Sequence, residues 1–351
     1  MVSRTRTGVT HYEVQKKRRA AFLDEWRRYR KRIIKRDEVQ LHDTPRGLRS
    51  GAYIGTEADS PTRTMDAQVH EIAPGAASTI HRHSWDAMTF IVEGSGWTEI
   101  DGVRHDWKPW DALHLPAWAW HRHGNDGHKT ARFMSYSSAP ILESFGMAVL
   151  EDAGHADVSG LASRPAFSQG VEGDDPYSRR MRRLAADQDE RRAARVHSAY
   201  DDITLLPTPR GTRTAFLVDR SIGYGASGIT QVMLQFAPGK GQSMHRHPGE
   251  AWLYVVEGHG HTYWGTEPTG GETREWEQGD LIIVDHFLWH QHVNDHPTET
   301  ARLVRIHMFD SLLETMRVLM DPMVLFEEPP EMLAKAPDIS NVEWPEDRRP
   351  T

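Results

Sequence analysis

The chain has 351 residues, a formal net charge of −8 and no cysteine, which excludes disulfides, cysteine-ligated zinc and cysteine nucleophiles. The acidic balance argues against general nucleic-acid binding, and no apolar run reaches the 18 residues of a membrane-spanning helix. With no apolar stretch at the N-terminus, these features predict a cytoplasmic protein without nucleic-acid or membrane partners. The 21 histidines and 12 tryptophans are the unusual part of the composition.

The first 50 residues form a basic arm. Apolar residues recur in it at helical spacing from Phe22 to Ile34, which predicts an amphipathic helix over residues 11–40. Its basic side suits an acidic partner or RNA, but we interpret it as a solvated face because the rest of the chain is acidic. We expect the apolar stripe to dock on the body of the protein or on another subunit.

Residues 51–150 consist of short apolar runs separated by Gly, Pro and Asp, a texture typical of strands. The predicted strands include Met88–Val92, Trp97–Ile100, Ala112–Leu115 and Ala131–Tyr136.

The remaining chain divides into three further segments. Residues 151–202 are a linker with a charged helix over Ser178–His197, and residues 203–310 are a second block rich in strands. In residues 311–351 we expect a helix over Ser311–Leu325 and then an extended tail rich in Pro and Glu.

A longer motif occurs twice in the two strand-rich blocks. Pro74-Gly75 precedes His81-Arg82-His83 and Gly94, and Pro238-Gly239 precedes His245-Arg246-His247 and Gly258. Each matched pair lies 164 positions apart. A constant offset of this kind predicts two copies of one domain.

Both copies carry a set of histidines with the spacing of metal ligands. Residues two apart in a strand face the same side, so the two histidines of each His-Arg-His point together. A third histidine follows in each copy, within Trp120-His121-Arg122-His123 and Trp289-His290-Gln291-His292. Ordinary polar strand residues are the alternative, but the recurrence of the whole pattern favours metal binding. The predicted ligands are His81, His83 and His121 in the first copy and His245, His247 and His290 in the second.

These two motifs resemble the signature motifs of the cupin superfamily, Pro-Gly-x5-His-x-His with a later Gly and then Pro-x3-Trp-His-x3-Asn. The resemblance implies an all-β core, a bicupin with two antiparallel β-barrel (double-stranded β-helix) domains and additional N-terminal, linker and C-terminal helices. The glutamate ligand of most metal cupins falls here at Ala87 and Ala251. The neighbouring acids, Asp86 and Glu250, alternate to the opposite face and should point outward.

A three-histidine pattern with alanine at this position resembles the gentisate, salicylate and 1-hydroxy-2-naphthoate 1,2-dioxygenase group. The resemblance is strongest in the string from Trp118 to Asn125. It implies Fe(II), one or two ions per chain, with Mn, Ni or Zn less favoured. The partners would be O₂ and a small phenolic substrate that chelates the metal and whose ring is cleaved, as in aromatic compound catabolism. His123 matches a family histidine near the substrate. His123 and its counterpart His292 are therefore the catalytic candidates, which would move a proton or hold bound oxygen. The alternative for each is a structural role, with the ring bonded to a backbone carbonyl.

The substrate pocket is expected at Trp85, Thr89, Trp97 and Trp120. The family holds the substrate carboxylate partly with an arginine at the position of Thr89 or Leu253, so a hydroquinone-like or bulkier phenol is as consistent with this chain as gentisate or salicylate. We expect the first copy to perform the chemistry, in a homodimer or homotetramer. A metal-dependent decarboxylase, lyase or isomerase and a non-catalytic bicupin that binds a small molecule are the competing hypotheses.

Overall fold

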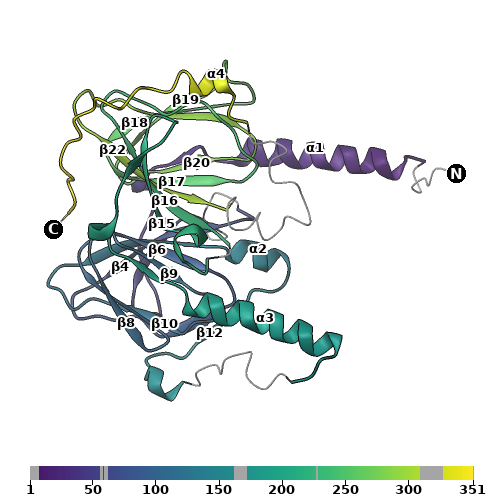
Figure 1. Cartoon of the computed structure of the whole chain (residues 1–351), viewed down its shortest axis with the longest axis vertical. Helices are drawn as coiled ribbons and strands as arrows, with labels where there is room; N and C mark the ends of the chain where they lie inside the picture. Colours follow the sequence, from purple (N-terminus) through teal and green to yellow (C-terminus); the bar gives the residue numbers. More distant parts are fainter. Residues whose placement is uncertain are drawn as a thin grey trace.

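The computed structural model describes residues 8–55, 58, 62–161, 172–226, 228–308 and 327–350. Two β-domains lie one above the other, and the N-terminal helix α1 (His11–Tyr29) extends away from them (Figure 1). The other helices of the described chain are α2 (Ala139–Ser144), α3 (Pro176–Ala193) and α4 (Pro330–Leu333), with four short 3₁₀ turns.

The first domain contains a seven-stranded sheet of order β13-β9-β6-β11-β4-β3-β2 and a five-stranded sheet of order β12-β5-β10-β7-β8. Its strands are β2 (His42–Asp43), β3 (Arg49–Ile54), β4 (Asp66–Ile72), β5 (His81–His83), β6 (Ala87–Glu93), β7 (Gly96–Ile100), β8 (Val103–Trp107), β9 (Ala112–Leu115), β10 (His121–Gly124), β11 (Ala131–Ser137), β12 (Leu150–Asp152) and β13 (His197–Ser198).

The second domain repeats this plan with a seven-stranded sheet of order β1-β20-β17-β22-β16-β15-β14 and a three-stranded sheet of order β19-β18-β21. Its strands are β1 (Ile33–Ile34), β14 (Leu206–Pro207), β15 (Arg213–Val218), β16 (Thr230–Phe236), β17 (Ala251–Glu257), β18 (His259–Gly265), β19 (Glu272–Glu277), β20 (Leu281–Val284), β21 (Trp289–Asn294) and β22 (Ala301–His307). The predicted all-β core with two domains is confirmed, although each domain is a sandwich of two sheets, neither of which closes on itself.

The two large sheets pack against each other, and this explains why their central strands are apolar on both faces. In β17, Trp252 and Tyr254 lie in the core shared by the two domains, whereas Leu253 and Val255 face the interior of the second domain. In β6, Phe90 faces the shared core in the same way. A strand buried on both sides loses the alternation of polar and apolar residues that marks a strand exposed on one face.

In each domain, one strand of the large sheet comes from a segment of the chain outside that domain. The arm after α1 adds Ile33 and Ile34 to the second domain, antiparallel to Ile282 and Leu281 of β20. The linker returns to the first domain, where β13 pairs with β9. These exchanges tie the arm and the linker to the two sandwiches by backbone hydrogen bonds.

The helices agree with the sequence in part. α1 begins at a capping box, in which the Thr10 amide donates to Glu13 and the Glu13 amide donates to the Thr10 hydroxyl. The predicted extension of this helix to residue 40 is wrong, because the chain turns to extended structure and its β-branched Ile33-Ile34 pair joins a sheet. A linker helix is present as predicted, α3, and Asp175 caps its first amides, but it ends at Ala193 and the predicted His197 lies in β13.

The predicted helix over Ser311–Leu325 lies outside the described residues. Beyond α4 the tail has no regular secondary structure up to residue 350. In the described part of the chain, no helix is both long and apolar enough to cross a membrane.

Candidate metal centres

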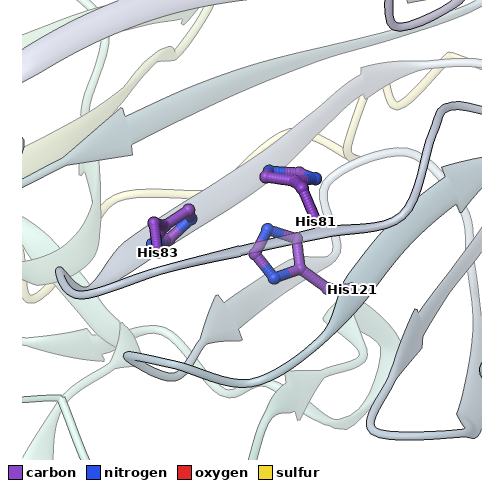
Figure 2. Close-up of side chains that lie close together, drawn as sticks. All are labelled: His81, His83 and His121. Carbon is purple, nitrogen blue, oxygen red and sulfur yellow. The ribbon is translucent and has the colours of Figure 1, made fainter. Parts of the chain in front are cut away.

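The three predicted histidines of the first domain meet in its interior. β5 supplies His81 and His83, and β10 supplies His121, which is paired in register with His81. One ring nitrogen from each lies within 4.8 Å of the others, and all three side chains are buried and face one another (Figure 2). The ring centroids of His81 and His121 are 4.2 Å apart, and those of His83 and His121 are 4.8 Å apart.

The second domain builds the same arrangement from His245, His247 and His290. The ring centroids of His245 and His290 are 4.2 Å apart, and those of His247 and His290 are 4.9 Å apart. One ring nitrogen of each again lies within 4.8 Å of the others. The two sites therefore share a geometry to within about 0.1 Å in these separations.

In five of the six histidines, all but His81, Nδ1 contacts a backbone carbonyl. The Nδ1 atoms of His83 and His121 contact the carbonyl oxygens of Trp85 and Ala119 at 2.7 and 2.9 Å. A carbonyl oxygen only accepts, so Nδ1 carries the proton and Nε2 keeps its lone pair. The second domain repeats this at 2.8–3.0 Å for His245, His247 and His290. A backbone contact of this kind is the usual support of a metal-binding imidazole.

Burial keeps the imidazoles neutral. It lowers the pKa of His83 to about 4 and that of His290 to about 3. It also lowers the pKa values of His81, His121 and His245, with help from the neighbouring rings and arginines. Since the neutral ring is the form that ligates a metal, both clusters are ready to bind a divalent ion at neutral pH.

The acids beside each motif do not join these clusters. Asp86 and Glu250 point away from the histidines, as predicted, but the expectation that they point outward to solvent is wrong. Asp86 accepts a hydrogen bond from the Gly228 amide at 2.9 Å, and Glu250 forms an ion pair with Arg30. Both carboxylates are buried because the opposite face of their strands is covered by the other domain or by the arm. Each triad thus offers three neutral nitrogen donors and no carboxylate.

Sequence reasoning missed an arginine beside each triad. Nη2 of Arg46 lies 2.8 Å from each ring nitrogen of His81, and Nη1 of Arg210 lies 3.3 Å from Nε2 of His245. The signal was present, because Thr-Pro-Arg-Gly occurs at Thr44–Gly47 and again 164 positions later at Thr208–Gly211. Arg210 also forms a two-bond ion pair with Glu328, at 2.5 and 3.2 Å.

The catalytic candidates His123 and His292 lie beside the triads. The Nδ1 of His123 is 2.9 Å from the Thr98 hydroxyl, which also accepts from the indole of Trp107 at 3.0 Å. His292 has an equivalent contact with Thr262 at 2.8 Å. Each ring is therefore oriented by a threonine rather than by the backbone carbonyl considered above, and burial lowers the pKa of His123 to about 3.

The four expected pocket residues separate into two pairs. Trp85 stacks on His83 with ring centroids 4.5 Å apart, and Thr89 is buried with its hydroxyl lacking a hydrogen-bond partner. Trp97 donates to Asp126 at the surface, and Arg82, whose side chain alternates away from the triad, lies 4.4 Å over the ring of Trp120. Trp97 lies beside the inward-facing Thr98 of β7, so strand alternation carries it to the outer face and away from the pocket. Trp120 is buried directly before β10, and its place in the pocket stays a prediction.

Comparison with known proteins agrees with this geometry. The family model of the cupin domain matches residues 68–137 and again residues 232–307, the two segments that carry the histidine clusters. The chain is a bicupin. This bicupin is 24% identical over 297 residues to 1-hydroxy-2-naphthoate 1,2-dioxygenase of Nocardioides sp. (strain KP7), an alignment that covers 81% of this chain and 73% of that protein.

Other relatives come from the same group. The bicupin is 35% identical over 94 residues to gentisate 1,2 dioxygenase 1 of Aquipseudomonas alcaligenes, covering 26% of this chain and 27% of that protein. It resembles the crystal structure of a salicylate 1,2-dioxygenase from Pseudaminobacter salicylatoxidans, with a TM-score of 0.54 and 18% identity over 80% and 78% of the two chains. It is therefore a bicupin of the group that contains the gentisate, salicylate and naphthoate dioxygenases.

Proposed function

We propose that the bicupin is a cytoplasmic Fe(II)-dependent dioxygenase that cleaves the ring of a hydroxylated aromatic substrate. The observation that carries the proposal is the pair of buried triads, in which the Nδ1 atoms of His83, His121, His245, His247 and His290 are held by backbone carbonyls. Three neutral nitrogen donors on one face suit Fe(II) more than Mg or Ca, which prefer oxygen ligands. The relatives named as 1,2-dioxygenases support the reaction class.

The ligands we propose are His81, His83 and His121 in the first domain and His245, His247 and His290 in the second. When bound there, Fe(II) would supply open positions for a chelating phenolic substrate and for O₂.

The remaining side chains of the first domain have separate tasks in this proposal. Arg46 brings a positive charge to the edge of the triad, where the acidic oxygens of the substrate would lie. Trp85 and Thr89 border the site, and His123, held in place by Thr98, exchanges a proton with the substrate hydroxyl. Since burial lowers its pKa to about 3, His123 is neutral before the reaction.

We also propose a homodimer or homotetramer. Three apolar side chains between α2 and β12 are more than half exposed, namely Phe145, Met147 and Leu150. A second copy of the chain would shield them from water.

Metal content tests the proposal. We expect about two irons per chain in anaerobically purified protein, and one fewer in each of His121→Ala and His290→Ala, because each substitution removes one of three donors. His128→Ala is the matched control, since His128 is exposed and outside both clusters. Oxygen uptake on a panel of phenols and hydroxybenzoates, measured in the same proteins, identifies the domain that performs the reaction.

Two outcomes would contradict the proposal. A metal content near zero after anaerobic addition of Fe(II), unchanged by either substitution, would show that the histidine triads do not bind iron. Full iron occupancy without oxygen uptake on any member of the panel would support the iron sites and contradict the ring-cleaving activity. The second result would favour a metal-dependent lyase, isomerase or decarboxylase, which turns over without oxygen.

A further inference from the structure

A cavity of about 1060 Å³ lies where the two domains, the linker and the C-terminal tail meet. The tail runs down the second domain to this junction (Figure 1). Its volume is at the upper end of the range for sites that hold small molecules. None of the six histidines of the triads lies on its wall, so the cavity is separate from both candidate metal centres.

The wall of this cavity is positively charged, although the whole chain carries a net charge of −8. Among the described residues, its acidic side chains are Asp201 and Asp347. Its basic side chains come from loops of the first domain, from two strands of the second and from the tail, namely Lys108, Lys129, Arg213, Arg302 and Arg349. Five cations against two acids give the cavity a local potential that attracts anions.

Both acids of the wall already pair with cations of the same wall: Asp201 with Lys108 and Arg349, and Asp347 with Arg302. The Tyr200 hydroxyl accepts a hydrogen bond from Arg302 and donates one to Asp347, each at 2.6 Å. A guanidinium and a phenol therefore hold the carboxylate that the tail brings to the junction. This wall recognises the oxygens of an acid, and the tail supplies only one such group.

The other two cations, Arg213 and Lys129, form no ion pair within the described residues. Arg213 donates to the Leu205 carbonyl at 3.2 and 3.0 Å, and its guanidinium lies 4.9 Å over the ring of Trp344. Burial and the nearby Arg302 lower the pKa of Arg213. Its charge is thus unfavourable in the cavity as it stands, and a bound anion would offset that cost. Lys129 is exposed on the loop between β10 and β11.

We propose that this cavity binds a small molecule with a diphosphate group, whose negative charges pair with Arg213 and Lys129. A single carboxylate would balance one of these cations, whereas one phosphate group already carries about −1.5 to −2 at pH 7. The planar guanidinium also matches two phosphate oxygens at once. Inorganic pyrophosphate and a nucleoside diphosphate share this group, and the test separates them. The site does not depend on the proposed function, because its residues lie outside both triads.

Calorimetric titration of the full chain with pyrophosphate, at constant ionic strength, tests the proposal. We expect saturable binding that weakens as salt is added. Arg213→Gln should weaken binding about 10- to 100-fold, the size expected for a charge-assisted hydrogen bond. Lys129→Gln should weaken it about two- to fivefold, because this side chain is exposed. A titration with ADP identifies the source of the group, since a nucleotide site binds ADP more tightly than pyrophosphate and a site for the inorganic ion binds it more weakly.

Three further variants make the result specific. Arg274→Gln is the matched control, because it removes one positive charge from an exposed site outside the cavity and should change the affinity less than twofold. Pyrophosphate can also ligate a metal, so the titration is repeated with His121→Ala/His290→Ala, which should bind it as the parent does. Lys129→Glu reverses the charge on an exposed loop and should weaken binding more than Lys129→Gln, which keeps the test decisive if Arg213→Gln does not fold.

The inference is overturned if the full chain shows no saturable binding of pyrophosphate at millimolar concentration. It is also overturned if the Arg213 and Lys129 variants bind as tightly as Arg274→Gln does. Loss of binding in His121→Ala/His290→Ala would assign the anion to the metal centres and likewise overturn it. Failure of the proposed function looks different, because it would be a lack of oxygen uptake while pyrophosphate still binds in an Arg213-dependent way.

Discussion

Besides the pairing of β1 with β20, a buried ion pair joins the N-terminal arm to the second domain, and removing its cation should destabilise the protein strongly. Arg30 follows α1 and pairs with Glu250, which immediately precedes β17, and both side chains are 0% exposed. Glu250 also accepts a hydrogen bond from the Thr64 hydroxyl and lies 3.4 Å from the indole nitrogen of Trp252. Burial lowers the pKa of Arg30 to about 10, so the guanidinium is still charged at neutral pH.

The expected cost of Arg30→Met follows from the carboxylate that it leaves behind. Methionine fills a similar volume, so the main loss is the counter-charge of Glu250 in a place that water does not reach. Breaking a buried pair in this way costs about 3–5 kcal/mol of the free energy of unfolding. For a protein of this size, about 1 kcal/mol lowers Tm by roughly 2–4 °C, so the loss should be roughly 6–20 °C.

Chemical denaturation at pH 7 measures the effect, with Lys31→Met as the matched control. Lys31 is the next residue and pairs with Glu38, but these two side chains are 41% and 42% exposed, so its removal should cost at most about 1 kcal/mol. The double variant Arg30→Met/Glu250→Met should recover most of the loss, because an apolar pair often replaces a buried ion pair without penalty. The reasoning is refuted if Arg30→Met costs no more than Lys31→Met, or if the two losses add in the double variant.

Two smaller perturbations test the interior of the first domain. Burial lowers the pKa of His70 to about 3. The unfolded chain takes up a proton there near pH 6.5 while the folded chain does not, so stability falls as the pH drops from about 6.5 toward 3 by up to about 1.4 kcal/mol per pH unit. His70→Leu, which copies Leu234 of the second domain, should reduce this slope in denaturation midpoints measured between pH 7 and pH 4, and an unchanged slope would contradict the assignment. Gly124→Ala would place a methyl group against the indole of Trp97, so we expect a loss of about 1–3 kcal/mol in unfolding experiments, relieved by adding Trp97→Ala.

The metal triads were predictable because they depend on local rules. Alternation along β5 sets His81 and His83 on one side, and the repeat shows that His121 and His290 belong to the same pattern. Arg46 was not found, although Thr-Pro-Arg-Gly is repeated as faithfully as His-Arg-His. The predicted boundary between the arm and the first domain, at residue 50, assigned this motif to the arm. In the structure the first sheet already includes β2, which begins at His42 and directly precedes the motif. Only the folded chain shows that the turn before β3 carries Arg46 back to His81.

Alternation also predicts the side to which a residue points but not what covers that side. Asp86 and Glu250 leave the interior of their domains as predicted, yet each meets another part of the chain and is buried. The same rule, applied to Trp97, would have assigned it to the outer face, where its indole donates to Asp126. The number of tryptophans near the motif had suggested a pocket wall, and counting residue types was the weaker argument.

The two domains show which parts of a duplicated site are constrained. Both copies keep the triad, the carbonyl contacts of its second and third histidines and the arginine of Thr-Pro-Arg-Gly. The walls have diverged to His70 and Ser135 in one copy and to Leu234 and Arg305 in the other. Because the His70–Ser135 contact of the first copy is replaced by Leu234 and Arg305 in the second, we expect the two interiors to favour different ligands. If the first domain performs the chemistry, as its motif predicts, we expect the interior of the second domain to prefer a different ligand.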